Sequence, residues 1–152
     1  MALNKKILLL AIAAIVMAVI FLQSQDYPQQ EANLMKSYAF LLADTPEKRN
    51  AGLSGKDSLP VDTVLLFSYE KDSSCSIWMK NMKFSIDVIW LDDKLTVISL
   101  KEGLSPGTYP RTFSPAAPCR YFIEAKAGFI QANNIRLNDK IAIDFASSLL
   151  SL

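Results

Sequence analysis

An uninterrupted apolar run close to the N-terminus, Ile7 to Leu22, places the strongest constraint on this chain's fold. The run holds 16 residues without a charge and directly follows Lys5 and Lys6. A helix of that length spans roughly 24 Å, which is short for a membrane span but close to it. A core helix that is apolar on every side would need more surrounding protein than the rest of the chain can supply. We therefore expect a membrane or export segment here, so the fold must be built from the residues that follow.

Two interpretations of segment 1–24 stay open, a signal anchor and a signal peptide. The lysines before the run follow the positive-inside rule, so both interpretations place the domain outside the cytoplasm, periplasmic or extracellular. An uncleaved anchor would hold the protein in the inner or cytoplasmic membrane through residues 7–22. A cleaved peptide would release a secreted domain, and Val16-Met17-Ala18 fits the −3 to −1 positions of a cleavage site.

The remaining chain is expected to form one domain. Residues 25–33 are polar and aperiodic, which is typical of a tether, and a single globular domain is predicted over 34–152. Since Lys5 and Lys6 precede the apolar run, 14 of the 16 basic residues remain against 15 acidic ones. This balance gives no reason to expect a nucleic-acid partner.

A helix start is predicted at Thr45. This residue suits an N-cap, Pro46 suits the first helical position, and Glu47 would lie beside the positive helix end. Gly52 or Gly55 is expected to end the helix. A second short helix is expected within residues 127–133.

Apolar patterning predicts strands through most of the domain. They are expected at 37–43, 64–69, 76–79, 86–91, 95–100, 120–125 and 140–145. Within 86–91, period-two alternation assigns Ile86, Val88 and Trp90 to one face and Asp87, Ile89 and Leu91 to the other. Asp92-Asp93-Lys94 predicts a hairpin into the next strand, and the four prolines of Lys101 to Pro118 predict a long irregular loop. We therefore expect an α+β domain, mainly β, with about seven strands in a compact barrel-like sheet and two short helices.

Lys80 and Asp87 stand among bulky apolar residues in the stretch SIWMKNMKFSIDVIWLDD, Ser76 to Asp93. Ionised side chains are rarely buried unless paired, so these two either pair with each other, reach solvent or line a pocket. A structural ion pair is the first interpretation. A ligand site is the second, and a catalytic Lys or Asp tuned by burial is the third.

The ligand-site interpretation adds three residues to Lys80 and Asp87. Trp78 offers a ring face for stacking, Asn81 an amide that both donates and accepts, and Arg49 a fork for carboxylate or phosphate. These five residues are the ligand-binding candidates.

Three segments of the chain resemble one known family. SIWMKNMKFSIDVIWLDD is similar to the signature of domain-of-unknown-function family 192, also called uncharacterised protein family 0127. LADTPEKRNAGLSGKDSLP, Leu42 to Pro60, resembles its N-terminal motif, and RYFIEAKAGFIQANNIRLNDKI, Arg120 to Ile141, its closing segment. The resemblance implies a prokaryotic family without an agreed activity, so it informs on fold more than on function.

Cys75 and Cys119 are candidates for a disulfide, because each precedes a predicted strand and the expected compartment is oxidising. The bridge would close a 45-residue loop, worth roughly 4 kcal/mol at most in the chain-entropy model. Two separate thiols are the plain alternative. A redox or nucleophilic role is a further one, although the chain has neither a CxxC pair nor an imidazole to lower a thiol pKa.

The absence of His from the sequence removes the usual general base near neutral pH and the commonest zinc ligand. We predict no catalytic constellation, no metal and no cofactor. The expected role is binding of a small polar ligand or an envelope protein. An extracytoplasmic enzyme of unknown reaction and a structural accessory domain are the alternatives.

Overall fold

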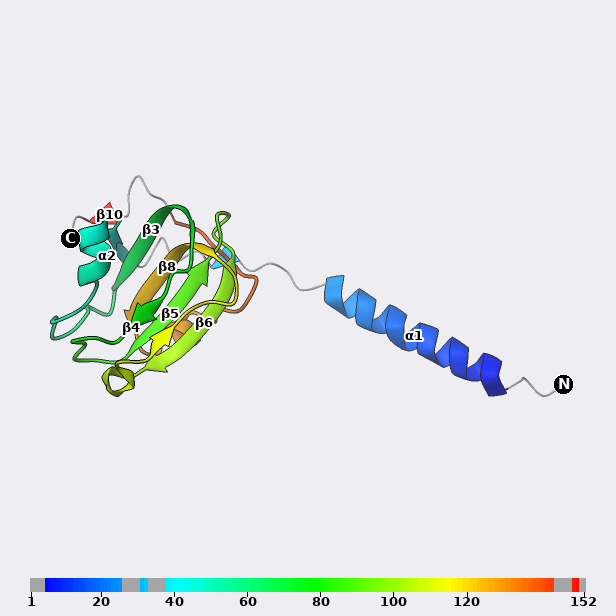
Figure 1. Ribbon diagram of the computed structural model, residues 1–152. Helices are drawn as coiled ribbons and strands as arrows, with labels where there is room; N and C mark the ends of the chain where they lie inside the picture. The colour runs from blue at the N-terminus through cyan, green and yellow to red at the C-terminus, as the bar shows by residue number, and fades with distance from the viewer. Residues whose placement is uncertain (1–4, 26–30, 33–37, 144–148, 151–152) are drawn as a thin grey trace.

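The computed structural model describes residues 5–25, 31–32, 38–143 and 149–150. Its first element is helix α1, Lys5–Gln25, which contains the apolar run and lies outside the β domain (Figure 1). Apolar side chains of α1 such as Leu9 and Ile15 are exposed. Among the described residues, no helix is both long enough and apolar enough to cross a membrane. The anchor or signal peptide expected at 1–24 stays a prediction.

The domain is organised around one mixed β-sheet with the strand order β10-β2-β3-β8-β5-β6. Its strands are β2 (Ala39–Ala43), β3 (Thr63–Ser73), β5 (Ile86–Leu91), β6 (Val97–Leu104), β8 (Cys119–Lys126) and the short edge strand β10 (Leu149–Leu150). The pairs β10-β2 and β2-β3 are parallel, and the remaining pairs are antiparallel. Two small sheets add β1 (Glu31–Ala32) beside β9 (Lys140–Ile141) and β4 (Ile77–Trp78) beside β7 (Thr112–Phe113). The mainly β, α+β class is confirmed.

The prediction of a barrel-like sheet is wrong. Within the part of the chain that the structure describes, β10 and β6 are edges and do not pair with each other. Period-two patterning identifies strands but carries no information on whether the first and last of them meet. The described residues form ten strands, more than the seven or so predicted. Two-residue strands such as β1 and β7 are too short to show a period-two pattern in the sequence.

The stretch from Lys101 to Pro118 is more regular than predicted. Strand β6 extends to Leu104, a 3-10 helix forms at Pro106–Thr108, and β7 follows. The last predicted strand, 140–145, is seen as β9, while residues 144 and 145 lie outside the described part of the chain.

The two predicted short helices are present. Helix α2 spans Pro46–Ala51 with Thr45 as its N-cap, whose Oγ1 accepts a hydrogen bond of 3.3 Å from the Lys48 N–H, and Gly52 is its C-cap. Helix α3 spans Phe129–Ala132.

Apolar residues pack on both faces of the sheet. Strand β5 is buried along its whole length. Its residues Ile86, Val88 and Trp90 belong to the core that lies on the side of α2 and the β4–β7 pair, whereas Ile89 and Leu91 belong to the core under α3. The predicted alternation is therefore correct, and the domain has three layers with the sheet in the middle.

Candidate functional site

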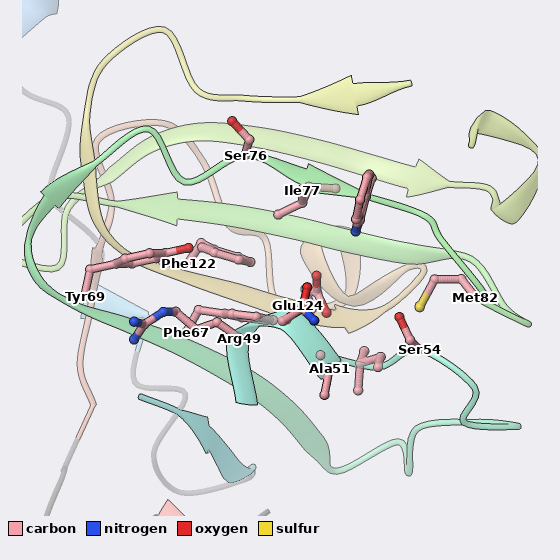
Figure 2. Close-up of a pocket in the computed structure, with 14 residues that line it drawn as sticks. Arg49, Ala51, Ser54, Phe67, Tyr69, Ser76, Ile77, Met82, Phe122 and Glu124 are labelled. Atoms are coloured by element: carbon pink, nitrogen blue, oxygen red, sulfur yellow. The ribbon is translucent and has the colours of Figure 1, made fainter. Parts of the chain in front are cut away.

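A pocket of about 280 Å³ opens between the sheet, α2 and β4. In Figure 2, Glu124 lies at its centre, with Phe67, Tyr69 and Phe122 to one side and Ser54 and Met82 to the other. The lining residues come from α2 and the turn after it, from β3 and β8 of the sheet, and from β4 and the loop beyond it. They are Arg49, Asn50, Ala51, Gly52, Leu53, Ser54, Phe67, Tyr69, Ser76, Ile77, Trp78, Met82, Phe122 and Glu124.

Glu124 is the central polar group of the pocket. It sits on β8 between Leu65 of β3 and Val88 of β5, and its side chain is only 6% exposed. Burial disfavours the ionised form and raises the pKa of the Glu124 carboxyl to about 8. The carboxyl is therefore mostly protonated at neutral pH.

The Glu124 carboxyl has no hydrogen-bond partner among the described residues. No fully buried side-chain oxygen or nitrogen in the described part of the chain lacks a partner. The Glu124 oxygens must therefore open onto the pocket. A group that is desolvated but unpartnered can gain a hydrogen bond from a ligand at little further cost.

Arg49 borders the pocket at the α2 side and is held rigidly. Its Nη1 donates to the carbonyls of Asp44 and Ser68 at 2.6 and 2.8 Å, and its guanidinium lies 4.7 Å from the centre of the Tyr69 ring. Burial raises the pKa of the Tyr69 hydroxyl, the nearby Arg49 charge opposes that shift, and Glu124 adds to it. Tyr69 is therefore a neutral neighbour of the guanidinium.

Gly52 keeps the floor of the pocket free. Its φ of +49° lies in the region that side chains rarely adopt, and a Cβ there would lie 3.4 Å from Phe67 Cζ and 3.9 Å from Glu124 Oε2. A glycine at this position lets the chain leave α2 close to the carboxyl without covering it.

Trp78 lines the pocket, with 45% of its surface exposed. Its ring contacts Tyr109 edge-on at 6.0 Å, and Lys80 Nζ lies 5.2 Å from the ring centre. Lys80 and Asn81 themselves do not line the pocket. Their carbonyls instead accept hydrogen bonds from Ser54 Oγ and Gly55 N–H, which tie this turn to the loop after α2.

Asp87 lies on the opposite face of the sheet from the pocket and does not pair with Lys80. Its side chain is 1% exposed and accepts from three backbone N–H groups, those of Gly103, Gly128 and Ile130, at 2.8 to 3.0 Å. The ion-pair interpretation of Lys80 and Asp87 is therefore wrong, because Asp87 points to the layer that contains α3 and its carboxylate is bound by backbone N–H groups there. Asp87 instead fastens β6 and the start of α3 to the central strand.

Cys75 and Cys119 form a disulfide, with their Cα atoms 6.0 Å apart. The bridge joins the segment before β4 to the first residue of β8. Next to it, Trp90 Nε1 donates a 2.8 Å hydrogen bond to the Cys75 carbonyl. The wall of the pocket is thus fixed to the strand that carries Glu124.

The structure brings together Arg49 and Trp78 and adds Glu124, which the sequence pattern does not single out. A signal for it exists: β8 reads Phe122-Ile123-Glu124, so the acid takes the same face as a core aromatic residue. Among the described residues, no group of three or more His, Cys, Asp or Glu lies together as a metal site would require. The arrangement is suited to hydrogen bonding and to holding an organic molecule against aromatic rings.

Comparisons with known proteins agree with the sequence resemblance. Residues 29–143 match the family model DUF192, described as "Uncharacterized ACR". A UPF0127 protein of Thermococcus gammatolerans is 32% identical over 68% of this chain and 65% of its own length, and one of Thermococcus kodakarensis is 32% identical over 66% and 62%. This chain thus covers less than two thirds of the length of either relative.

Two solved structures share the fold. One is a protein of unknown function from Novosphingobium aromaticivorans, with a TM-score of 0.64, 20% identity, and coverage of 68% of this chain and 73% of that one. The other, from Sinorhizobium meliloti, is described as a candidate transcription regulator, with a TM-score of 0.62, 23% identity, and coverage of 66% and 78%. At these identities the likeness supports the fold alone.

Proposed function

Because this chain belongs to the DUF192 family, whose description assigns no activity, we propose its function from the pocket: it binds a small polar ligand beside Glu124. The observation that carries the proposal is the Glu124 carboxyl, which is nearly buried, protonated at neutral pH and without a partner in the described protein. Such a group is costly to keep in a fold unless something binds it. The cavity of about 280 Å³ falls near the lower end of ligand pockets, which argues for a small molecule.

We further propose that the domain works outside the cytoplasm, either tethered to the inner or cytoplasmic membrane through residues 7–22 or secreted. Lys5 and Lys6 before the apolar run support this orientation. The Cys75–Cys119 disulfide supports it independently, since disulfides persist in oxidising compartments. An envelope protein is the alternative partner.

The proposal is tested by comparing the small molecules that copurify with the wild type and with a variant whose pocket is filled by a larger side chain. The full chain would be purified from its own host, denatured, and the released small molecules identified by mass spectrometry. Ala51→Trp places a large ring at the pocket lining, and Leu137→Trp is the matched control at an exposed position that does not line it. We expect a molecule that accompanies the wild type and Leu137→Trp but not Ala51→Trp. Equal release from all three proteins would contradict the proposal.

An enzyme is the second candidate, because a carboxyl with a pKa of about 8 can donate and accept protons near neutral pH. If the ligand is chemically changed, Glu124→Gln should abolish turnover while it retains binding. Unchanged ligand after prolonged incubation with the wild type would favour binding alone.

A further inference from the structure

The charge of the pocket-lining residues indicates which chemical class of small molecule would bind. This inference rests on the proposed function. We infer that the ligand is a small organic carboxylate that accepts a hydrogen bond from the O–H of the Glu124 carboxyl, in a pocket whose positive charge is the Arg49 guanidinium beside Tyr69. Its hydrocarbon part would lie against the aromatic residues of the pocket.

The pocket carries about one positive charge at neutral pH. Of its lining residues only Arg49 and Glu124 are charged types, and the Glu124 carboxyl is mostly neutral because its pKa is about 8. Arg49 forms no ion pair with any described acidic residue. A ligand with a single negative charge would neutralise the site, whereas a phosphate, with about two charges, would exceed it.

Arg49 and the protonated Glu124 both have hydrogen-bond donors available for an acid group. Both known bonds of Arg49 start from Nη1, so Nε and Nη2 have no acceptor among the described residues. The protonated Glu124 carboxyl provides one O–H. Hydrogen bonds between such donors and a carboxylate are of the strong, charge-assisted kind.

The remaining walls suit a hydrocarbon skeleton. Phe67 and Phe122, which stack with ring centres 4.0 Å apart, and Trp78 all line the pocket. Lys80, exposed beside the Trp78 ring, places a second positive charge outside the pocket, where it would attract an anion.

Few groups near Glu124 titrate besides itself. Among the residues that line the pocket, the other titratable groups are the Arg49 guanidinium on α2 and the Tyr69 hydroxyl on β3, whose pKa is raised. The neighbouring residues on β4 and β5, Ile77 and Val88, are apolar. Proton exchange on ligand binding near pH 8 would therefore report on the Glu124 carboxyl.

Calorimetric titration of the full chain with three probes of similar size tests the inference: benzoate, benzamide and benzylamine. Benzoate should bind more tightly than the other two. Because it would hold Glu124 in its protonated form, binding at pH 8.5 should take up roughly 0.8 proton, measured from the buffer dependence of the enthalpy. Benzoate affinity should fall by about fivefold between pH 8 and pH 9 and by nearly tenfold for the next pH unit.

Glu124→Gln supplies the matched variant, because its amide N–H replaces the O–H donor but cannot titrate. It should retain benzoate binding without proton uptake or loss of affinity between pH 8 and 9.5. Glu70→Gln, at an exposed carboxyl on β3, should behave as the wild type.

Three outcomes would overturn the inference. Benzylamine binding with proton release would make Glu124 a counter-ion for a cation, and equal binding of benzamide would make charge irrelevant. Tighter binding of phenyl phosphate than of benzoate would refute the single-charge match. Each of these leaves the proposed function standing, whereas failure of benzoate, benzamide, benzylamine and phenyl phosphate alike to bind at 10 mM would count against both the inference and the proposed function.

Discussion

Glu124→Gln should remove a pH dependence from the stability of this protein. The Glu124 carboxyl has a pKa of about 8 in the fold and an ordinary value of 4.5 when exposed. A carboxyl whose pKa is raised by folding contributes stability that is fully present below about pH 4.5. This stability is lost as the pH rises to about 8, because the carboxyl ionises at a lower pH in the unfolded chain than in the fold. The wild type should therefore weaken across this range, and the glutamine variant should not.

The size of this loss of stability follows from the pKa difference of the Glu124 carboxyl between the folded and unfolded states. At 1.36 kcal/mol per pKa unit, the largest possible loss is about 5 kcal/mol. Because the Glu124 oxygens open onto the pocket, solvent can stabilise part of the ionised form, and we expect about 3 kcal/mol between pH 5 and pH 9.

Urea unfolding followed by circular dichroism measures this loss in the full chain held in non-ionic detergent. The free energy of unfolding should fall by about 3 kcal/mol more in the wild type than in Glu124→Gln over that range. Glu70→Gln, at an exposed site, controls for the loss of a carboxyl. Parallel pH profiles for the wild type and Glu124→Gln would refute the reasoning, because they would show that the carboxyl is as well solvated folded as unfolded.

Three further outcomes follow from the fold. Asp87→Ala should lower the free energy of unfolding by about 3 kcal/mol or more, since three backbone N–H groups lose their acceptor, whereas Asp57→Ala at an exposed ion pair should change it by less than about 1 kcal/mol; similar losses in urea melts would contradict this. Replacing Cys75 and Cys119 together by Ser should cost up to about 4 kcal/mol in the same melts, and an unchanged midpoint would show that the bridge adds nothing. Protease added outside intact cells, with any outer membrane permeabilised, should digest the domain after Gln25; protection until the cytoplasm is opened would reverse the proposed orientation.

Local features of this fold could be predicted from the sequence because their causes are local. The limits of α2 follow from a capping residue, a proline and a glycine within eight residues, and the two faces of β5 follow from its period of two. The disulfide could be anticipated from the oxidising compartment that the sequence predicts, although its geometry could not. The failure to close a barrel could not be predicted, because it depends on which edge strands meet.

The candidate site was harder to predict because its parts come from distant segments. Arg49 and Trp78 carry distinctive side chains and can be identified from the sequence, but that Glu124 lines the same pocket depends on the register of β8 between β3 and β5. Asp87, in contrast, is singled out by the sequence as a ligand-binding candidate but does not line the pocket. Its charge in an apolar strand indicates a special role, and only the packing of α3 shows that the role is to hold backbone amides.

The two tryptophans of this chain occupy contrasting environments, and this gives the protein an optical reporter of its own. Trp90 is sealed in the core with its indole N–H bound to a carbonyl, so its emission should lie at short wavelength and resist aqueous iodide. Trp78 borders the pocket and is 45% exposed, so iodide should quench it. A molecule that fills the pocket should shield Trp78 alone, which would make occupancy visible in unlabelled protein and allow compound collections to be screened by fluorescence.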